Sequence, residues 1–283
     1  MSRIVYVNGE YLPEEDAKIS IFDRGFLMAD AVYEVTSVID GKILAFDGHT
    51  ERLARSLREL DMKAPCTIDE LLDIHRELIT RNDLVEGLIY LQVTRGVADR
   101  DFAYPDVEPS IVLFTQTKNV VDSPMAKKGM KVISIPDIRW GRRDIKTVQL
   151  LAPSMGKMAA KAAGCDDAWL VEDGFVTEGT SNNAYIVTQE GTIVTRNLGH
   201  EILAGITRDA VLRFAAEAQI KIEERPFTIE EATQAKEAFV TSATTFVGPV
   251  VEIDGAQIGD GKVGGIARRL REIYLEESLK TAI

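Results

Sequence analysis

The stretch DIRWGRRDIKTVQLL, residues 137–151, contains the residue on which the interpretation of the chain depends. Lys146 lies between Ile145 and Thr147 in a run otherwise suited to burial, and burying an ammonium without a partner costs free energy. Arginines close in space would favour its neutral form, which is a nucleophile suited to Schiff-base chemistry. Three arginines precede it: Arg139, Arg142 and Arg143. Taken alone, the segment favours the simpler interpretation, a strand-end lysine whose ammonium reaches water.

A second segment, GFVTEGTSNNAYIV at residues 174–187, places a carboxylate at the end of an apolar strand. Small polar residues follow Glu178 and offer donors in a tight space: Thr180, Ser181, Asn182 and Asn183. A carboxylate in this position is suited to binding a protonated ring nitrogen. The alternative is a hairpin loop with a solvated glutamate, and the motif alone favours that alternative.

A candidate anion site lies in LAGITRDAVLRF, residues 203–214. Gly205 precedes a predicted helix whose first turn contains Ile206 and Thr207. Unpaired N–H groups and a hydroxyl at a helix start bind anions. The alternative is simple capping of the helix by Thr207.

The segment HTERL, residues 49–53, places a cation near another helix start. Thr50 is the predicted N-cap, which puts Arg52 in the first turn. The helix dipole disfavours a cation there, so we expect an anion as the partner of Arg52. The alternative is a surface arginine paired with Glu51 or another acid.

The pattern of apolar runs and turns predicts an α+β protein with two domains. Turn dipeptides typical of β-hairpins separate the apolar runs: Asn8-Gly9, Asp40-Gly41, Asp173-Gly174 and Glu190-Gly191. A polar, proline-containing segment near the middle of the chain breaks this pattern. We therefore expect an N-terminal α+β domain at 1–118, an interdomain linker at 119–128 and a C-terminal domain at 129–283.

Composition argues against several classes of function. The formal net charge is −12, whereas nucleic-acid and anionic-membrane binding need a basic field. No stretch approaches the ~20 apolar residues that a membrane helix needs. Two cysteines without a secretion signal predict free thiols in the cytoplasm, and three histidines argue against a histidine-rich metal site, so no metal is expected.

The order of these segments resembles the fold-type IV enzymes that use pyridoxal 5′-phosphate. This family includes D-amino-acid transaminases, branched-chain transaminases, (R)-selective amine transaminases and aminodeoxychorismate lyases. The resemblance is closest to the D-amino-acid transaminases and covers nearly the whole chain, from YVNGEYL to IDGAQIGDGKVG. The matching segments are DRGFLMADAVYEV, HTERL, YLQVTRG, DIRWGRRDIKTVQLL, VTEGTSNNAYIV, GITRD and FVTSATT. It implies a two-domain fold-type IV enzyme.

The resemblance also implies roles for individual residues. Lys146 matches the lysine that carries the cofactor as a Schiff base and later moves a proton, and Glu178 matches the carboxylate that binds the pyridine nitrogen. Arg52, Ile206 and Thr207 match residues that bind the phosphate. The other matches are Arg139 and Leu203 beside the cofactor, Ser242, Ala243 and Thr244 in a phosphate-side turn, and Tyr33 on the substrate side. The family often has threonine at the position of Ala243, which leaves a backbone contact there.

Substrate recognition is assigned to the segment VTRGVADRDFAYPD, residues 93–106. It resembles the loop of the family that binds the substrate carboxylate, and Arg100 matches the arginine of that loop. The family often has histidine where this chain has Phe102. This difference replaces a polar contact by an apolar wall and raises the (R)-amine alternative. Acids flank Arg100 on both sides, so a surface arginine paired with Asp99 or Asp101 is the other interpretation.

The resemblance implies a transaminase that moves an amino group from a D-amino acid to a 2-oxo acid such as 2-oxoglutarate or pyruvate. It also implies a homodimer whose carboxylate-binding loop reaches over to the other subunit. The alternatives are an (R)-selective amine transaminase and a branched-chain-type transaminase. A non-enzymatic protein that only binds pyridoxal 5′-phosphate is the least favoured, because Lys146 and Glu178 are both present.

Overall fold

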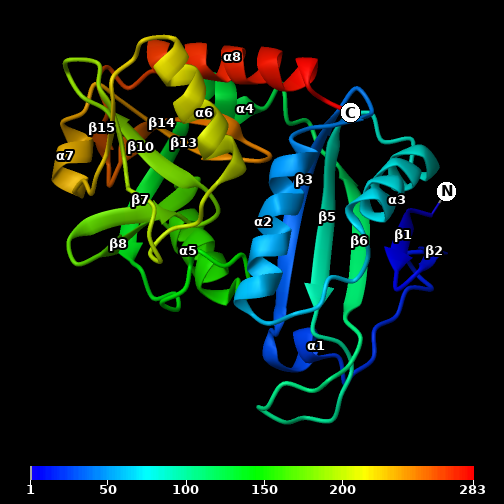
Figure 1. Ribbon diagram of the computed structural model, residues 1–283. Helices are drawn as coiled ribbons and strands as arrows, with labels where there is room; N and C mark the ends of the chain where they lie inside the picture. Colours follow the sequence, from blue (N-terminus) through cyan, green and yellow to red (C-terminus); the bar gives the residue numbers. More distant parts are fainter. Residues whose placement is uncertain (1) are drawn as a thin grey trace. The chain divides into compact units, whose positions relative to one another are not determined.

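The computed structural model describes residues 2–283, which form two units with a sheet in each (Figure 1). Unit 1 contains the described residues up to Val120 together with Ile145–Gln149 and Thr281–Ile283. Unit 2 contains Val121–Asp144 and Leu150–Lys280. The chain first passes from unit 1 to unit 2 inside the segment predicted as the linker. Lys146, which the sequence placed in the C-terminal domain, folds with unit 1.

Unit 1 is built on an antiparallel sheet of six strands in the order β2-β1-β6-β5-β3-β4. Its strands are β1 (Ile4–Val7), β2 (Glu10–Pro13), β3 (Ala31–Ile39), β4 (Lys42–Ile43), β5 (Gly87–Thr94) and β6 (Ser110–Thr117). The hairpin turns predicted at Asn8-Gly9 and Asp40-Gly41 are confirmed, because each of these residues has the positive φ of a type I′ turn.

Three helices belong to this sheet: α1 (Arg24–Met28), α2 (Phe46–Glu59) and α3 (Ile68–Arg81). Helix α2 contacts β3, and α3 contacts β1 and β6. The predicted start of α2 at Thr50 is wrong. The helix begins at Phe46 after Ala45, and the Thr50 hydroxyl donates to the carbonyl of Asp47. Arg52 therefore lies beyond the first turn, where the helix dipole no longer opposes it.

Unit 2 is built on a mixed sheet of nine strands, in the order β12-β11-β10-β13-β14-β7-β8-β9 with β15 paired to β14. These strands are β7 (Met130–Pro136), β8 (Asp167–Glu172), β9 (Phe175–Gly179), β10 (Asn183–Val187), β11 (Ile193–Thr195), β12 (Ile222–Glu224), β13 (Glu237–Ser242), β14 (Phe246–Ile253) and β15 (Ala256–Gln257). The hairpins predicted at Asp173-Gly174 and Glu190-Gly191 are confirmed.

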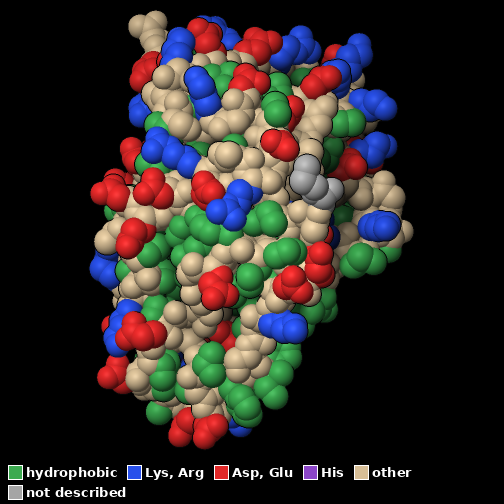
Figure 2. Space-filling model, turned by 90° about the vertical axis from the view of Figure 1, so that its right-hand side faces the viewer, with side chains coloured by type: hydrophobic (Ala, Val, Ile, Leu, Met, Phe, Trp, Pro, Cys, Tyr) green, Lys and Arg blue, Asp and Glu red, His purple; other side chains and the backbone are tan. Residues whose placement is uncertain are grey.

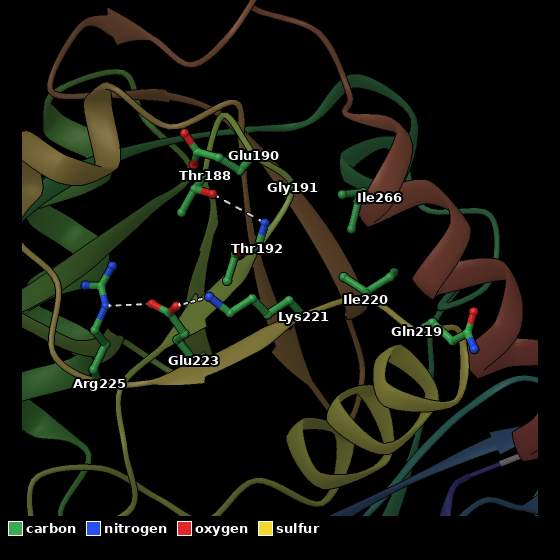
Figure 3. A pocket seen from close by; sticks show the side chains of 10 residues that line it. All are labelled: Thr188, Glu190, Gly191, Thr192, Gln219, Ile220, Lys221, Glu223, Arg225 and Ile266. Carbon is green, nitrogen blue, oxygen red and sulfur yellow. Dashed lines mark hydrogen bonds and ion pairs between the residues drawn. The ribbon is translucent and has the colours of Figure 1, made fainter.

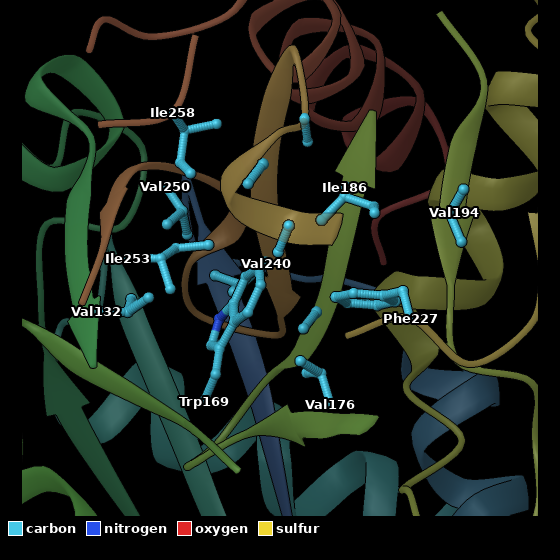
Figure 4. Packing of buried hydrophobic residues seen from close by; sticks show 14 of the residues in the cluster. Val132, Trp169, Val176, Ile186, Val194, Phe227, Val240, Val250, Ile253 and Ile258 are labelled. Carbon is cyan, nitrogen blue, oxygen red and sulfur yellow. The ribbon is translucent and has the colours of Figure 1, made fainter. Parts of the chain in front are cut away.

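The helices of unit 2 are α4 (Pro124–Lys128), α5 (Leu151–Ala162), α6 (Ile206–Glu217), α7 (Ile229–Thr233) and α8 (Gly265–Lys280). The core of unit 2 centres on Trp169, whose ring meets the Phe227 ring edge-on at 5.9 Å (Figure 4). Valine and isoleucine side chains from β7, β10 and β14 surround this pair. Such burial stabilises the sheet that carries the polar groups described below.

The sequence-derived α+β class is confirmed in both units, since each combines helices with a sheet. None of the helices formed by residues 2–283 is long and apolar enough to cross a bilayer.

Candidate active site

The segment that contains Lys146 lies alongside strand β3 of unit 1. The Tyr33 N–H donates to the carbonyl of Lys146 at 3.0 Å, and the Val148 N–H donates to the carbonyl of Ala31 at 3.1 Å. The Lys146 ammonium lies 4.2 Å from the centroid of the Tyr33 ring. Within residues 2–283 no carboxylate pairs with this ammonium. An aromatic face, and not an acid, therefore holds the amine, which leaves it available for chemistry.

The arginines expected to act on Lys146 are paired with acids in unit 2. The pairs are Arg139 with Asp137 and Glu178, Arg142 with Asp144, and Arg143 with Glu172. Because each guanidinium has a carboxylate beside it, its charge is compensated locally. The expected effect of this arginine cluster on Lys146 thus has no support in the structure.

Arg52 belongs to a buried cluster with Glu34 and His49 in unit 1. Its Nε and Nη2 donate to the two Glu34 oxygens at 2.8 and 2.7 Å, and His49 Nδ1 lies 2.7 Å from Glu34 Oε2. Burial raises the pKa of Glu34, but the opposing effects of Arg52 and His49 bring it down to about 2. Burial lowers the pKa of His49, so its neutral ring donates Nδ1–H to Glu34. The carboxylate therefore fixes the orientation of the guanidinium.

Glu178 is a buried carboxylate in unit 2 and not the solvated loop residue of the simpler interpretation. Arg139 binds one of its oxygens, while Asn183 Nδ2 and the Leu203 N–H donate to the other at 3.0 and 3.2 Å. Burial raises the pKa of Glu178 against the lowering effect of Arg139. The carboxyl thus binds a proton more readily than an exposed glutamate, which suits it to sharing one with a basic nitrogen.

Helix α6 begins close in space to Glu178. Asn183 Nδ2 also donates to the Leu203 carbonyl at 2.9 Å, which ties the carboxylate to the residues before the helix. The N-cap is Gly205, which supplies no side-chain oxygen to the first turn. A Cβ at this position would lie 2.2 Å from Asn183 Oδ1, so a larger residue would displace the side chain that binds Glu178. Capping by Thr207 is wrong, since this residue lies inside the helix.

Thr207 and Ile206 form the first turn of α6. The Thr207 side chain is buried and hydrogen-bonded to Tyr274. A hydroxyl offers one donor and two acceptor positions, so this bond does not exhaust it. The geometry keeps the helix start as a candidate anion site, with the backbone N–H groups as its main donors.

The turn Ser242–Thr244 follows strand β13. Ser242 Oγ accepts from the Thr245 N–H at 3.2 Å, so this hydroxyl serves the turn itself. Ala243 has no polar side chain, and both Ala243 and Thr244 are half-buried. The turn therefore offers its backbone N–H groups and the Thr244 hydroxyl as donors.

Arg100 and Phe102 lie in an exposed loop of unit 1, Val97–Tyr104. The Arg100 guanidinium carbon is 5.3 Å from the centroid of the Phe102 ring, and Phe102 is 77% exposed. Asp101 accepts from the Ala103 N–H instead. In the part of the chain that the structure describes, neither neighbouring acid forms an ion pair with Arg100.

Two residues that were not predicted from the sequence complete these clusters, Glu34 and Asp137, whereas Asn183 is one of the donors predicted beside Glu178. Glu34 did leave a signal, because it is an acid at a buried position within the apolar strand AVYEVTSVI. Asp137 binds Arg139 at 2.7 Å and accepts from the Thr177 hydroxyl at 2.7 Å, and no local pattern indicates that pair.

A separate hollow of about 700 Å³ in unit 2 contains none of the predicted site residues (Figure 3). It is lined by Thr188, Glu190, Gly191, Thr192, Gln219, Ile220, Lys221, Glu223, Arg225 and Ile266. Lys221 and Arg225 pair with Glu223 at 2.7 and 3.2 Å, so these charges compensate one another. No three His, Cys, Asp or Glu side chains among residues 2–283 are placed to hold a metal ion.

Comparison with known proteins gives a match over most of the chain. Residues 31–253 match the profile of the family Amino-transferase class IV. The D-alanine aminotransferase of Staphylococcus haemolyticus is 38% identical over 272 residues, which is 95% of this chain and 95% of that protein.

Solved structures of branched-chain amino acid aminotransferases share the fold. The T.th. enzyme with pyridoxamine 5′-phosphate has a TM-score of 0.88 and 27% identity, covering 98% of this chain and 94% of that one. An Escherichia coli enzyme has a TM-score of 0.90 and 22% identity, covering 98% and 95%, and this likeness concerns the fold alone. These neighbours agree with the two-unit α+β architecture.

Proposed function

Because the chain belongs to amino-transferase class IV, we propose that it moves an amino group from a D-amino acid to a 2-oxo acid such as 2-oxoglutarate or pyruvate, with pyridoxal 5′-phosphate as cofactor. The relationship to D-alanine aminotransferase, at 38% identity over 95% of the chain, supports the choice of donor. Within the structure, one observation carries the proposal. The Lys146 amine lies on the Tyr33 ring without a carboxylate partner among residues 2–283.

The residues present fit the chemistry of each part of this cofactor. A phosphate needs cationic and N–H donors, which Arg52 in unit 1 and the start of α6 in unit 2 offer. A pyridine nitrogen needs an acidic partner, and the raised pKa of the buried Glu178 carboxyl suits it to that contact. An aldehyde needs an amine, which Lys146 offers.

When bound, the cofactor supplies an electron sink for the bond that breaks at the substrate Cα. Lys146 Nζ would take the Cα proton and deliver it, within the same half-reaction, to the carbon that carried the cofactor aldehyde, and the Tyr33 ring would limit where the amine moves. Glu178 holds a proton at the ring nitrogen. Arg52, which Glu34 orients in unit 1, is one proposed phosphate ligand, and Ile206 and Thr207 in unit 2 are proposed as others.

Further contacts complete the proposal. Leu203 and Arg139 line the cofactor beside Glu178, and the backbone of Ser242–Thr244 serves the phosphate side. Arg100 binds the substrate α-carboxylate, which an exposed guanidinium without an acid partner can do with two parallel hydrogen bonds. Tyr33 and Phe102 form the walls for the rest of the substrate.

Two alternative donors remain. Phe102 stands where the family often has histidine, which favours some (R)-amine activity. The likeness to branched-chain aminotransferases at 27% identity is the basis for the branched-chain alternative. A non-enzymatic role is the least supported, because Lys146 and Glu178 are both present, the first half-buried on the Tyr33 ring and the second buried with hydrogen-bond donors.

The partners that we propose are small molecules and a second copy of the chain. Exposed apolar residues of unit 1 lie in the segment around α1 and in the loop with Arg100: Ile19, Ile21, Phe22, Phe26, Val97, Phe102 and Tyr104. Figure 2 shows that hydrophobic side chains also reach the surface on the face that it presents. In unit 2, Leu151, Met155 and Met158 form an exposed stripe along α5. Such surfaces favour a homodimer.

The composition supports a small-molecule enzyme of the cytoplasm. The net charge of −12 provides no basic field for nucleic acid. Cys66 and Cys165 are free thiols, as expected in a reducing compartment.

The test is a comparison of amino donors with the cofactor-loaded protein. D-alanine, L-leucine and (R)-1-phenylethylamine are each offered with 2-oxoglutarate, and the product oxo compound is measured. We expect D-alanine to give the highest kcat/KM. A preference for L-leucine would support the branched-chain alternative, and a preference for the amine would support the (R)-amine alternative. No turnover of any donor would overturn the proposal.

A further inference from the structure

Two arginines share one carboxylate oxygen in the interior of unit 1. Arg24 Nε and Arg95 Nε donate to Asp30 Oδ2 at 2.8 and 2.7 Å. Their side chains are 3%, 5% and 11% exposed for Arg24, Arg95 and Asp30 respectively. These residues, called the Asp30 node below, come from the start of α1, the residue before β3 and the residue after β5.

The Asp30 node holds the loop Val97–Tyr104 at several points. Arg24 Nη1 donates to the carbonyl of Asp101 at 2.6 Å, and the Arg95 guanidinium carbon lies 3.5 Å from the centroid of the Tyr104 ring. At its start the loop pairs with the residues before α1, because the Ala98 N–H donates to the Phe22 carbonyl at 3.2 Å; just before the loop, the Arg24 N–H donates to the Gly96 carbonyl at 2.9 Å. The loop is therefore held at its beginning, middle and end.

The same node also holds helix α2. Arg95 Nη2 and Nη1 donate to the carbonyls of Leu60 and Asp61, just after the last residue of the helix, at 2.7 and 3.1 Å. The Arg95 guanidinium thus binds the end of α2 through its two Nη atoms and Asp30 through its Nε. Because these partners are fixed parts of unit 1, Arg95 gives Arg24 and Asp30 a rigid base.

Burial makes the Asp30 node sensitive to change. Two guanidinium charges meet one carboxylate, and a buried charge that loses its partner is strongly destabilising. Apolar side chains could fill this space without such a requirement. Apolar side chains cannot donate a hydrogen bond to a backbone carbonyl, whereas the planar guanidinium of arginine can hold one at a defined position.

The carbonyl that Arg24 binds belongs to the residue between Arg100 and Phe102. These two side chains lie beside each other, with 5.3 Å from the guanidinium carbon to the ring centroid, and both are exposed. Asp101 is thus anchored towards the interior through its carbonyl while its neighbours project outwards.

We propose that Arg24 is a positioning residue for substrate selection: through the Asp30 node it presets the Val97–Tyr104 loop so that Arg100 meets the carboxylate of a substrate. The inference rests on the proposed function for the role of Arg100. Its physical basis is that a small misplacement of a binding group weakens the interaction that it makes. A carboxylate substrate therefore depends on Arg24, and an amine without a carboxylate does not.

The experiment uses the cofactor-loaded enzyme with Arg24→Lys. This substitution keeps a positive charge beside Asp30 but removes the guanidinium that donates to the Asp101 carbonyl. We expect KM for D-alanine to rise by about 10-fold, consistent with the loss of one hydrogen bond to a charged donor. We expect kcat and the KM for (R)-1-phenylethylamine to change little. Hydrogen–deuterium exchange should become faster in Val97–Tyr104. Arg3→Lys is the control, because it loses an arginine contact to the Thr115 carbonyl elsewhere in unit 1.

A second variant covers the case in which Arg24→Lys does not fold. Tyr104→Leu removes the ring over Arg95 at an exposed residue, and we expect a smaller rise in the KM for D-alanine with faster loop exchange. Equal effects on both donors, or unchanged loop exchange, would overturn the inference. If the parent enzyme does not use D-alanine, the proposed function fails, whereas the exchange measurement still decides whether Arg24 holds the loop.

Discussion

The Glu34 carboxylate and the Arg52 guanidinium are joined by two hydrogen bonds, Nε to Oε1 at 2.8 Å and Nη2 to Oε2 at 2.7 Å. The pair connects strand β3 to helix α2, and His49 adds a third contact to the same carboxylate. The direction of the arginine is therefore set by a strand of the sheet. A flexible arginine would lose more side-chain entropy on binding a phosphate than one held in this way.

Replacing Glu34 by glutamine should loosen the cofactor. Glutamine keeps the size but loses the charge and one of the two acceptor positions, so Arg52 is no longer held by two charge-assisted bonds. We expect the Kd for pyridoxal 5′-phosphate to rise about 10-fold, in line with one lost charged hydrogen bond. Titration of the cofactor-free protein measures it. Glu77→Gln, which breaks a surface pair with Arg81, is the control, and equal effects of the two changes would contradict the prediction.

Lys146 should be the residue that reacts with the cofactor. Borohydride reduction followed by peptide mapping is expected to place the pyridoxyl group on Lys146, because its amine has no acid partner within residues 2–283. Lys157 and Lys161 on α5 are internal controls, and Lys157 is already paired with Asp167 at 3.1 Å. A label on either control lysine would disprove the assignment.

Glu178→Ala should lower turnover while the protein stays folded. The loss of one electrostatic contact in the active site typically costs ~10²–10³ in rate. Steady-state kcat, measured with circular dichroism as a check on folding, tests this expectation. Glu190→Ala, at an exposed turn, is the matched control. Near-normal turnover in Glu178→Ala would show that the buried carboxylate serves only the structure around Asn183.

Arg100→Ala should distinguish amino-acid donors from amines. Arg100 is exposed in the free protein, so the expected cost of ~2–5 kcal/mol applies where the bound substrate removes water from the pair, and kcat/KM for D-alanine should then fall strongly. Turnover of (R)-1-phenylethylamine should change little or improve. Phe102→His, which restores the residue often found in the family, is expected to lower amine activity in the parent background. Equal losses for both donors would mean that Arg100 supports the loop and not the substrate.

His75 should make stability depend on pH. Burial lowers the pKa of His75 to about 4 from the ordinary 6.5, against a hydrogen bond to the Leu71 carbonyl. Between these values the unfolded chain binds a proton that the folded protein does not. The contribution of His75 to the free energy of unfolding should therefore be fully present above pH 6.5. It should be lost as the pH falls towards 4, which lowers the free energy of unfolding by roughly 3 kcal/mol.

Urea unfolding of His75→Gln at several pH values tests this dependence. In the variant, the free energy of unfolding should change much less with pH between 6.5 and 4 than in the parent. The pH dependence that remains comes from other groups such as the buried His49, whose pKa is also lowered. His200→Gln, at an exposed residue, should keep the slope of the parent. An unchanged slope in His75→Gln would assign the acid sensitivity to other residues.

The sequence could predict features that depend on neighbouring residues. The hairpins at Asn8-Gly9 and Asp173-Gly174 follow from residues that adopt positive φ readily. For Glu178 the local motif alone favoured a solvated loop residue, and only the resemblance to the family pointed to a buried ligand; the structure buries the carboxylate. Local propensity and turn chemistry are sufficient for the hairpins.

Features that depend on tertiary contacts could not be predicted in this way. The pairing of Glu34 with Arg52 joins a strand and a helix, and only packing brings them together. The arginines before Lys146 were expected to influence it, but carboxylates elsewhere in unit 2 compensate them. The start of α2 at Phe46 was missed because Ala45 is a left-handed N-cap without a side-chain hydrogen bond, and no capping pattern indicates it.

The division of the chain has a consequence for the order in which unit 1 is completed during synthesis. Ile145–Gln149 lies along β3, and Ile283 exchanges two backbone hydrogen bonds with Ile43. A nascent chain ending at Val120 therefore lacks both of these strand partners. Unit 2 must emerge from the ribosome before Ile283 can reach Ile43. Expression of residues 1–120 alone would leave these edges of β3 and β4 unpaired, and such edges favour pairing with other chains.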